Sequence, residues 1–246
     1  MVHQEHTTKA FDADIDKMRS IIITMGGLVE KQFTRAVDSV RYGDLKLITQ
    51  VLTDEDVVNQ LHVQADMQCN QILARRQPFA IDLREVLGAI HTVNDLERVG
   101  DEAKKIALKA RDMEASAQRM GLPVESIQQI AEDVRNMLSL ALDAFVRHDT
   151  SIASELARID REVDAQRTAL HKQLMGWMGG PGDMPRHGDM PRSSEAVSAA
   201  LDLIFVVQSI ERIGDHAKNV AEYVVRVVDG IDLRHAGNRE SASANS

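Results

Sequence analysis

Apolar residues recur along most of the chain at steps of three and four, which is the spacing of a helix with one buried face. Residues 7–42 show this pattern most clearly, at Phe11, Ile15, Met18, Ile22, Met25, Val29, Phe33, Val37 and Val40. Further helices are expected at residues 44–76, 80–113, 124–147, 150–177 and 194–228. The pattern therefore predicts an all-α protein with six helices.

A nine-residue motif occurs twice in the chain, at residues 96–104 and again 114 residues later. Each copy contains Glu-Arg, one apolar residue, Gly-Asp and, after one variable residue, Ala-Lys. The helices that precede the two motifs also match each other, at an offset of 105 residues. Such repetition indicates two related halves. We therefore predict two tandem three-helix bundles related by an internal repeat, at residues 1–120 and 121–230, followed by a disordered tail at residues 231–246.

The offset grows from 105 to 114 residues because the second half carries an insertion at residues 176–192. This insertion is rich in Gly, Pro and Met, and it contains Gly-Asp-Met-Pro-Arg twice in tandem. The composition predicts a flexible surface loop in which His187 is solvated.

The composition narrows the class of protein. A formal net charge of −9 argues against general nucleic-acid binding and against docking on anionic lipid. The single cysteine, Cys69, excludes an internal disulfide and fits a reducing compartment, and we expect it to be buried. The N-terminus is too polar for a secretory signal, and no apolar run is long enough for a transmembrane helix. The sequence therefore predicts a soluble, cytoplasmic protein without membrane insertion.

Polar or acidic side chains spaced four residues apart occur in four of the predicted helices. On a helix this spacing places both side chains on one face, and consecutive helices joined by short loops pack antiparallel, so the pairs can face each other. The candidate residues are Glu55, Glu97 and Asp101 in the first half and Asp160, Asp164, Glu211 and Asp215 in the second. Clustered carboxylates lower their repulsion by sharing a hard cation, so we predict one metal site in each half.

The two predicted sites are not equivalent. Asn59 stands where the second half has Asp164, so the first site should hold a metal less strongly. Gly100 costs about 1 kcal/mol relative to alanine within a helix, and its small size would let a backbone or an ion approach closely. The alternative is a solvated acidic edge without a metal, in which Asp101 pairs with Lys105 one turn later.

Several signatures of enzymes are missing from the sequence. It has no Gly-rich phosphate loop followed by Lys-Ser/Thr, and no Gly-x-Ser-x-Gly nucleophile setting. No histidine follows a glutamate at i+3, as in carboxylate-bridged di-iron bundles. His216 lies one position from Asp215, about 100° around the helix, so we expect it to be solvated or to pack. We expect Arg98 to point away from the packed face. We therefore predict that the protein is not an enzyme.

Five further stretches accompany the doubled motif: Met25–Gln32, Ala74–Pro78, Ile81–Arg84, Ala141–Phe145 and Asp232–Gly237. Together with the motif, they resemble the PhoU family of phosphate-responsive regulators. The resemblance covers about residues 6–237, and the Gly-Asp-Met-Pro-Arg insertion is the departure from it.

The resemblance implies two three-helix bundles side by side with pseudo-twofold symmetry. It also implies metal clusters on Glu97, Asp101, Glu211 and Asp215, with Asp160, Asp164 and Glu55 as partners. It further implies a cytoplasmic adaptor, often a homodimer, whose partners are the ATPase of the phosphate ABC transporter and the phosphate sensor histidine kinase. Such a protein keeps the phosphate-starvation (Pho) response off when phosphate is plentiful.

The identity of the metal stays open, because all-oxygen ligands suit divalent or trivalent ions such as Fe, Zn, Mg, Mn or Ca. Two other functions also stay open. One is a metal-independent helical scaffold, and the other is a metalloenzyme with open coordination positions. The missing histidine ligands argue against redox di-iron chemistry in the second case.

Overall fold

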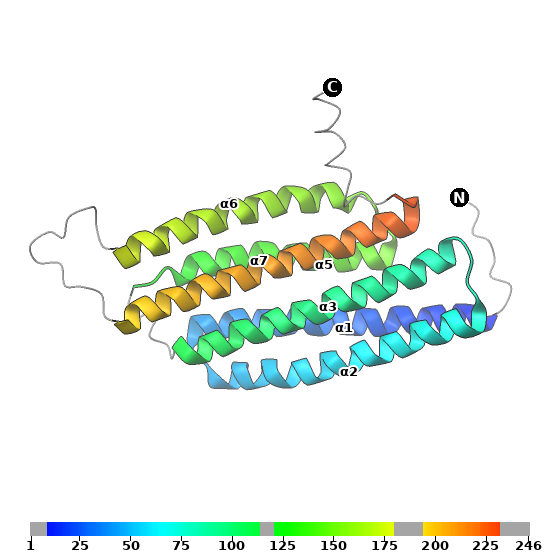
Figure 1. The fold of residues 1–246 in the computed structure, drawn as a ribbon, viewed down its shortest axis with the longest axis horizontal. Coiled ribbons are helices and arrows are strands. Elements are labelled where there is room, and N and C mark those ends of the chain that lie inside the picture. The colour runs from blue at the N-terminus through cyan, green and yellow to red at the C-terminus, as the bar shows by residue number, and fades with distance from the viewer. Residues whose placement is uncertain (1–8, 114–120, 180–193, 232–246) are drawn as a thin grey trace, which may run out of the picture.

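The computed structural model describes residues 9–113, 121–179 and 194–231, and these residues form six helices (Figure 1). The helices are α1 (Lys9–Tyr42), α2 (Leu45–Arg76), α3 (Ile81–Met113), α5 (Val124–Arg147), α6 (Ile152–Gly179) and α7 (Ser194–Asp229). The six predicted helices are confirmed, because each predicted end lies within two residues of the observed one. Most of the insertion with His187, the link at 114–120 and most of the predicted tail lie outside the described residues.

The turns between helices follow local backbone chemistry. Gly43 takes a φ of 65°, the left-handed conformation that ends α1 at little cost for a glycine. Asp44 then caps α2, because its Oδ1 accepts a hydrogen bond of 2.8 Å from the backbone N–H of Lys46. Asp149 accepts the equivalent bond of 2.9 Å from the N–H of Ser151 before α6. The two caps lie 105 residues apart, which is the offset between the first two helices of each half.

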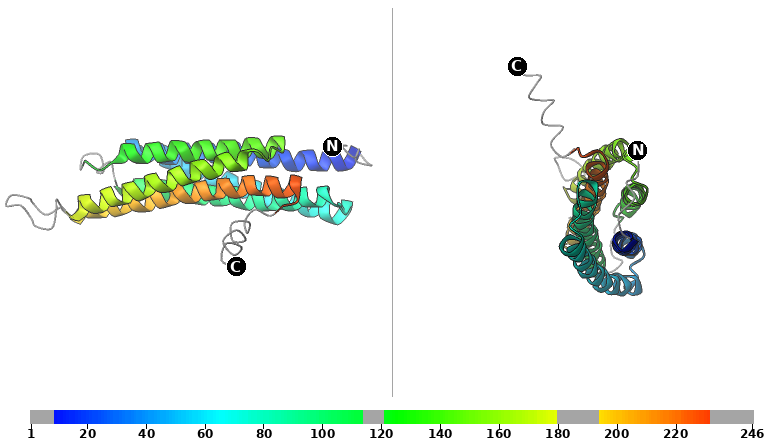
Figure 2. Two further views of the ribbon diagram at one scale, coloured as in Figure 1. Left: turned by 90° about the horizontal axis from the view of Figure 1, so that it is seen from above. Right: turned by 90° about the vertical axis from the view of Figure 1, so that its right-hand side faces the viewer.

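Each half is a three-helix bundle, and the two bundles lie side by side (Figures 1 and 2). In the first half α1, α2 and α3 pack on one another, and in the second half α5, α6 and α7 do the same. The halves join mainly along α3 and α7, and also along α1 and α5. The predicted all-α tandem repeat is confirmed, and residues at equivalent positions of the two halves can be compared directly.

One apolar core runs through both halves. Two glycines mark places where the halves approach most closely. A Cβ on Gly26 of α1 would lie 2.6 Å from Cδ2 of Leu142 in α5, and a Cβ on Gly88 of α3 would lie 2.5 Å from Cγ2 of Val227 in α7. Within the described residues, no helix combines the length and the apolar run needed to cross a membrane.

Candidate functional site: two acidic clusters

The first acidic cluster is centred on the Glu55 carboxylate, which α2 carries into the interior beside α3. Glu55 is only 2% exposed, and its Oε2 accepts a 2.9 Å hydrogen bond from Nε2 of the fully buried Gln32 in α1. Asn59 donates to Oε1 over 3.4 Å. A Cβ on Gly100 would lie 2.9 Å from Oε2 of Glu55 and 3.1 Å from Oε1 of Gln32. The motif glycine therefore admits a carboxylate and an amide into the helix interface, whereas its small size had led us to expect a backbone or an ion there.

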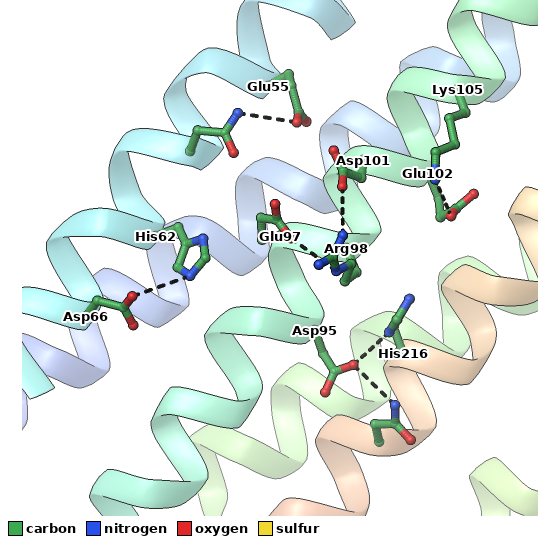
Figure 3. A network of polar contacts seen from close by, with 12 residues as sticks. Glu55, His62, Asp66, Asp95, Glu97, Arg98, Asp101, Glu102, Lys105 and His216 are labelled. Atoms are coloured by element: carbon green, nitrogen blue, oxygen red, sulfur yellow. Dashed lines mark hydrogen bonds and ion pairs between the residues drawn. The ribbon is translucent and has the colours of Figure 1, made fainter.

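The other two carboxylates of this cluster lie nearer the surface of α3. The guanidinium of Arg98 reaches both, with Nε 3.5 Å from Oε2 of Glu97 and Nη1 3.3 Å from Oδ2 of Asp101 (Figure 3). Arg98 points away from the packed face as expected, since its side chain is 63% exposed, but its length lets the guanidinium reach back along the helix to these two acids. The pairing of Asp101 with Lys105, which belonged to the alternative without a metal, does not occur among the described contacts of Lys105, whose Nζ lies 2.7 Å from Oε1 of Glu102.

Burial is the main influence on the ionisation of Glu55. Desolvation raises the pKa of its carboxyl, and the charge of Asp101 raises it further, while the hydrogen bond from Gln32 and the charge of Lys104 oppose the rise. The charge of Asp101 on α3 therefore acts on Glu55 of α2, although the main cause of the raised pKa is burial.

The second acidic cluster is more open and is crossed by two cations. Lys218 lies 2.7 Å from Oδ2 of Asp160 and 3.9 Å from Oδ1 of Asp215. Arg167 lies 3.3 Å from Oδ1 of Asp164 and 3.5 Å from Oε1 of Glu211. Four carboxylates of α6 and α7 therefore face one another with two basic side chains among them.

The second cluster also shifts the ionisation of its members. Burial raises the pKa of Glu211, and the charges of Asp215 and Asp164 add to the rise. Burial likewise raises the pKa of Asp215, with further contributions from Asp160 and Asp164. Burial thus destabilises the charged forms of Glu211 and Asp215, the neighbouring acids add to the effect, and Arg167 and Lys218 oppose it. A bound cation would relieve the part that comes from repulsion.

A further polar network at the α3–α7 interface was missed by the sequence reasoning. Asp95 of α3 is only 7% exposed. Its Oδ1 lies 2.6 Å from Nδ1 of His216 and accepts a 3.2 Å hydrogen bond from Asn219 (Figure 3). The expectation of a merely solvated or packing His216 was therefore wrong. Its partner lies on the other half of the chain, 121 positions away.

The pseudo-symmetric counterpart of this network holds Glu102. Burial alone would raise the pKa of Glu102, but hydrogen bonds from Lys105 and Ser209 and the charges of Lys105 and Arg212 together lower it. At the offset of 114 residues, Ser209 corresponds to Asp95 and His216 to Glu102. The offset of 114 residues was the signal that could have related the two contacts. In a twofold arrangement, when a residue of one half contacts a residue of the other half, the counterparts of these two residues also contact each other.

The donor set of the two clusters fits a hard cation in its chemistry, because the predicted ligands are carboxylate oxygens. In the described parts of the chain, no three His, Cys, Asp or Glu side chains converge closely enough to hold a metal ion in the observed rotamers. Arg98, Arg167 and Lys218 lie among the carboxylates instead. A metal would have to displace these cations. Cys69 is buried as expected, and burial raises the pKa of its thiol to about 12.

Together, the fold and the clusters define an all-α tandem-repeat protein with an acidic cluster at equivalent places in its two halves. The family model of the PhoU domain matches this chain twice, over residues 22–110 and 127–224. The chain belongs to the PhoU family.

Named relatives support the same assignment. The chain is 39% identical to the phosphate-specific transport system accessory protein PhoU homolog of Pseudomonas aeruginosa, over 94% of this chain and 90% of that protein. It is 34% identical to the phosphate-specific transport system accessory protein PhoU of Escherichia coli, over 96% of this chain and 92% of that protein. These relatives are named as accessory proteins and not as enzymes.

Solved structures agree with the fold. The crystal structure of PhoU from Pseudomonas aeruginosa superposes with a TM-score of 0.79 at 37% identity, covering 90% of this chain and all of that one. The phosphate transport system regulatory protein PhoU from Streptococcus pneumoniae, at 23% identity, shares the fold with a TM-score of 0.78 over 91% of this chain and 99% of that one.

Proposed function

We propose that this protein is a cytoplasmic negative regulator of phosphate uptake and of the phosphate-starvation response. It would couple the ATPase of the phosphate ABC transporter to the sensor histidine kinase, and it would shift the kinase toward its phosphatase state when phosphate is plentiful. The observation that carries the proposal is identity of 34–39% over nearly the whole chain to accessory proteins of the phosphate-specific transport system. An adaptor needs surfaces for two partners, and the exposed faces of two similar helical bundles supply them.

The test of this function is deletion of the gene followed by growth in phosphate-rich medium. Expression of phosphate-uptake genes should rise severalfold and return to its starting level when the wild-type gene is restored. The readout is a transcriptional reporter on a phosphate-uptake promoter, with a strain that lacks the sensor kinase as control. Unchanged expression after deletion would count against the regulatory role.

We further propose that the two acidic clusters hold metal ions. In the second half the ligands would be Asp160, Asp164, Glu211 and Asp215, whose mutual repulsion a cation would relieve. In the first half they would be Glu55, Glu97 and Asp101. A bound metal would supply fixed positive charge at the surface of the bundle, where acidic or phosphorylated groups of a partner could dock.

Displacement of the chain's own cations sets the affinity of such a site. Lys218 must leave Asp160 and Arg167 must leave Glu211 before a metal can share those oxygens. Metal binding should also weaken as the pH falls through the raised pKa of Glu211, because protons compete for the same oxygens.

The metal proposal is tested by elemental analysis of protein purified without chelator. Wild-type protein should carry metal, and the double variant Glu211→Gln/Asp215→Asn should lose the metal of the second half. A matched control is Glu155→Gln/Glu162→Gln, since both acids of α6 pair with Arg158 in the described part of the chain and lie outside the cluster. Equal metal content in all three proteins would favour the alternative of a metal-independent scaffold, in which Arg98, Arg167 and Lys218 alone neutralise the acids.

A further inference from the structure

A cavity of about 290 Å³ lies between α6 and α7, directly beside the second acidic cluster. Its wall contains Asp160 and Lys218, which belong to that cluster, and Glu222, which does not. The rest of the wall is formed by Ala153, Leu156, Ala157, Arg161 and Ala221. Lys218 therefore lies at the boundary between the acidic cluster and this space, which we call the α6–α7 cavity.

Lys218 is held on the cluster side of this boundary, but an acid also attracts it from the cavity side. Its Nζ lies 2.7 Å from Oδ2 of Asp160 and 3.9 Å from Oδ1 of Asp215. Burial lowers the pKa of Lys218, but the hydrogen bond and charge of Asp160 raise it overall, with further contributions from the charges of Asp215 and Glu222. Glu222 stands four residues after Lys218 on α7, a spacing at which helical side chains can pair.

A metal in the second acidic cluster would compete directly with this lysine. Asp160 and Asp215 are predicted metal ligands, and the ammonium of Lys218 lies against an oxygen of each. A divalent ion that shares these oxygens also repels the ammonium. The side chain can respond, because the flexible four-carbon stem of lysine lets the ammonium move while the backbone stays in place.

The α6–α7 cavity provides a second place for the ammonium. Glu222 lies in its wall at a partly buried position, and a carboxylate can accept hydrogen bonds from several donors. Charges in a partly buried pair are screened less than charges in bulk water. Pairing with Glu222 would therefore offset part of the free energy that Lys218 loses on leaving Asp160.

The first half of the molecule lacks this arrangement. Leu52 and Leu108 stand at the positions equivalent to Ala157 and Glu222, at the offsets of 105 and 114 residues. The first half thus has a large apolar side chain where the second half has a small one, and it has no acid one turn after Lys104, the counterpart of the cluster's lysine. The second half combines a lysine within the cluster, an acid one turn further and a cavity that joins them.

We propose that Lys218 is a built-in competitor for the metal of the second acidic cluster, and that a bound metal moves its ammonium from Asp160 to Glu222 across the α6–α7 cavity. The exchange weakens the second site relative to what its four carboxylates alone would give. The advantage expected from Asp164 in place of Asn59 is thereby reduced. This inference rests on the proposed metal binding and names the residues that regulate it.

Binding of Mn²⁺ to the full-length protein tests the exchange. The background Glu97→Gln/Asp101→Asn removes the first cluster, so the electron paramagnetic resonance signal of free Mn²⁺ reports on the second site. In this background Lys218→Met should tighten Mn²⁺ binding about fivefold, because the competitor is gone. Glu222→Gln should weaken it about threefold, because the displaced ammonium loses its acceptor.

A double-mutant cycle separates the exchange from simple attraction between Glu222 and the metal. Glu222→Gln should have no effect once Lys218→Met is present, since no ammonium then needs an acceptor. An equal loss of affinity with and without Lys218 would show that Glu222 acts by its own charge, and it would overturn the exchange. The matched control is Glu162→Gln, an acid of α6 that pairs with Arg158 outside the cluster, which should leave Mn²⁺ binding unchanged.

A filled cavity tests the path of the lysine. Ala157→Leu gives the α6–α7 cavity the side chain of the first half, so it should weaken Mn²⁺ binding by keeping the ammonium on the cluster side. The control is Ala165→Leu, at an exposed position of α6 outside the cavity wall. Melting temperatures show that both variants are folded, and equal Mn²⁺ affinity in the two would overturn the cavity as the receiving place.

Crystal structures without and with Mn²⁺ give a direct readout. The ammonium of Lys218 should lie on Asp160 without the metal and on Glu222 with it. A lysine in bulk solvent or still on Asp160 in the Mn²⁺-bound structure overturns the exchange alone, as does a Lys218→Met variant that binds Mn²⁺ no more tightly. Absence of Mn²⁺ binding in every variant, Lys218→Met included, overturns the metal proposal and the exchange together.

Discussion

In the first half of the molecule, the buried amide of Gln32 binds a carboxylate beside the motif glycine. In the second half, the thioether of Met137 occupies the position of that amide. Gln32 of α1 binds Glu55, and both approach Gly100. At the equivalent place in the second half, the Sδ and Cε of Met137 lie 3.6 and 3.7 Å from where a Cβ of Gly214 would be. Met137 is fully buried and makes this interface apolar.

The two equivalent carboxylates, Glu55 and Asp160, also differ in position. Asp160, the counterpart of Glu55, turns toward Lys218 and forms a 2.7 Å ion pair instead of entering the interface. The same helix framework thus supports a buried polar contact in one half and an apolar contact in the other. We expect one position of α1 and α5 to control this burial, because a buried charge needs a hydrogen-bond donor and methionine provides none.

The largest effect is expected from Gln32→Met, which gives the first half the side chain of the second. The variant leaves the Glu55 carboxylate buried without its main donor, so the free energy of unfolding should fall by about 3 kcal/mol at pH 7. The loss should shrink at pH 4, because Glu55, whose pKa is raised, is then largely protonated. Urea unfolding at both pH values measures this, and equal losses at the two would argue against a role for the charge.

The two motif glycines should respond differently to alanine. Gly214→Ala should stabilise the protein by about 1 kcal/mol, because its Cβ meets only ordinary contacts at 3.5 Å or more and the helix gains propensity. Gly100→Ala should lower the free energy of unfolding by about 1 kcal/mol net, because displacing Glu55 and Gln32 costs more than the helix gains in propensity. Thermal unfolding of both variants gives the comparison, and matching effects would mean that the two interfaces are equally permissive.

A smaller effect is expected from neutralising the carboxylates. With chelator present, Glu55→Gln should raise the free energy of unfolding by about 1 kcal/mol at pH 7, because the new amide can donate to the unpartnered Oε1 of Gln32. For an acid with a raised pKa, the native state is favoured at low pH and loses that advantage as the pH rises through the folded pKa. The gain should therefore vanish near pH 4.

The matched substitution in the second half should change the free energy of unfolding in the opposite direction. Asp160→Asn removes the partly exposed ion pair with Lys218, so the free energy of unfolding should fall by less than about 1 kcal/mol. Denaturant titrations of the two variants side by side test the difference. A stabilising effect in both halves would show that Asp160 is strained in its observed position.

Much of the fold could be predicted from the chain alone. Apolar steps of three and four gave the helices, and the doubled motif gave the tandem repeat, because both are local or periodic properties of the sequence. The acids of α6 and α7 share Arg167 and Lys218, whereas the metal sites themselves stay a prediction. Arg98 lies on the exposed side of α3 as predicted, but its contacts with Glu97 and Asp101 were not foreseen, because a helical wheel fixes the direction of a Cβ but not the path of a long flexible side chain.

The sequence by itself determined the helices, their caps at Asp44 and Asp149, and the duplication that makes the two halves comparable. Only the tertiary structure decided which acid is buried, which is paired with a cation and which, like Asp95, meets His216 of the other half. The physical reason is that helix formation depends on neighbours within one or two turns, whereas the ionisation and pairing of a side chain depend on groups that packing brings from distant positions.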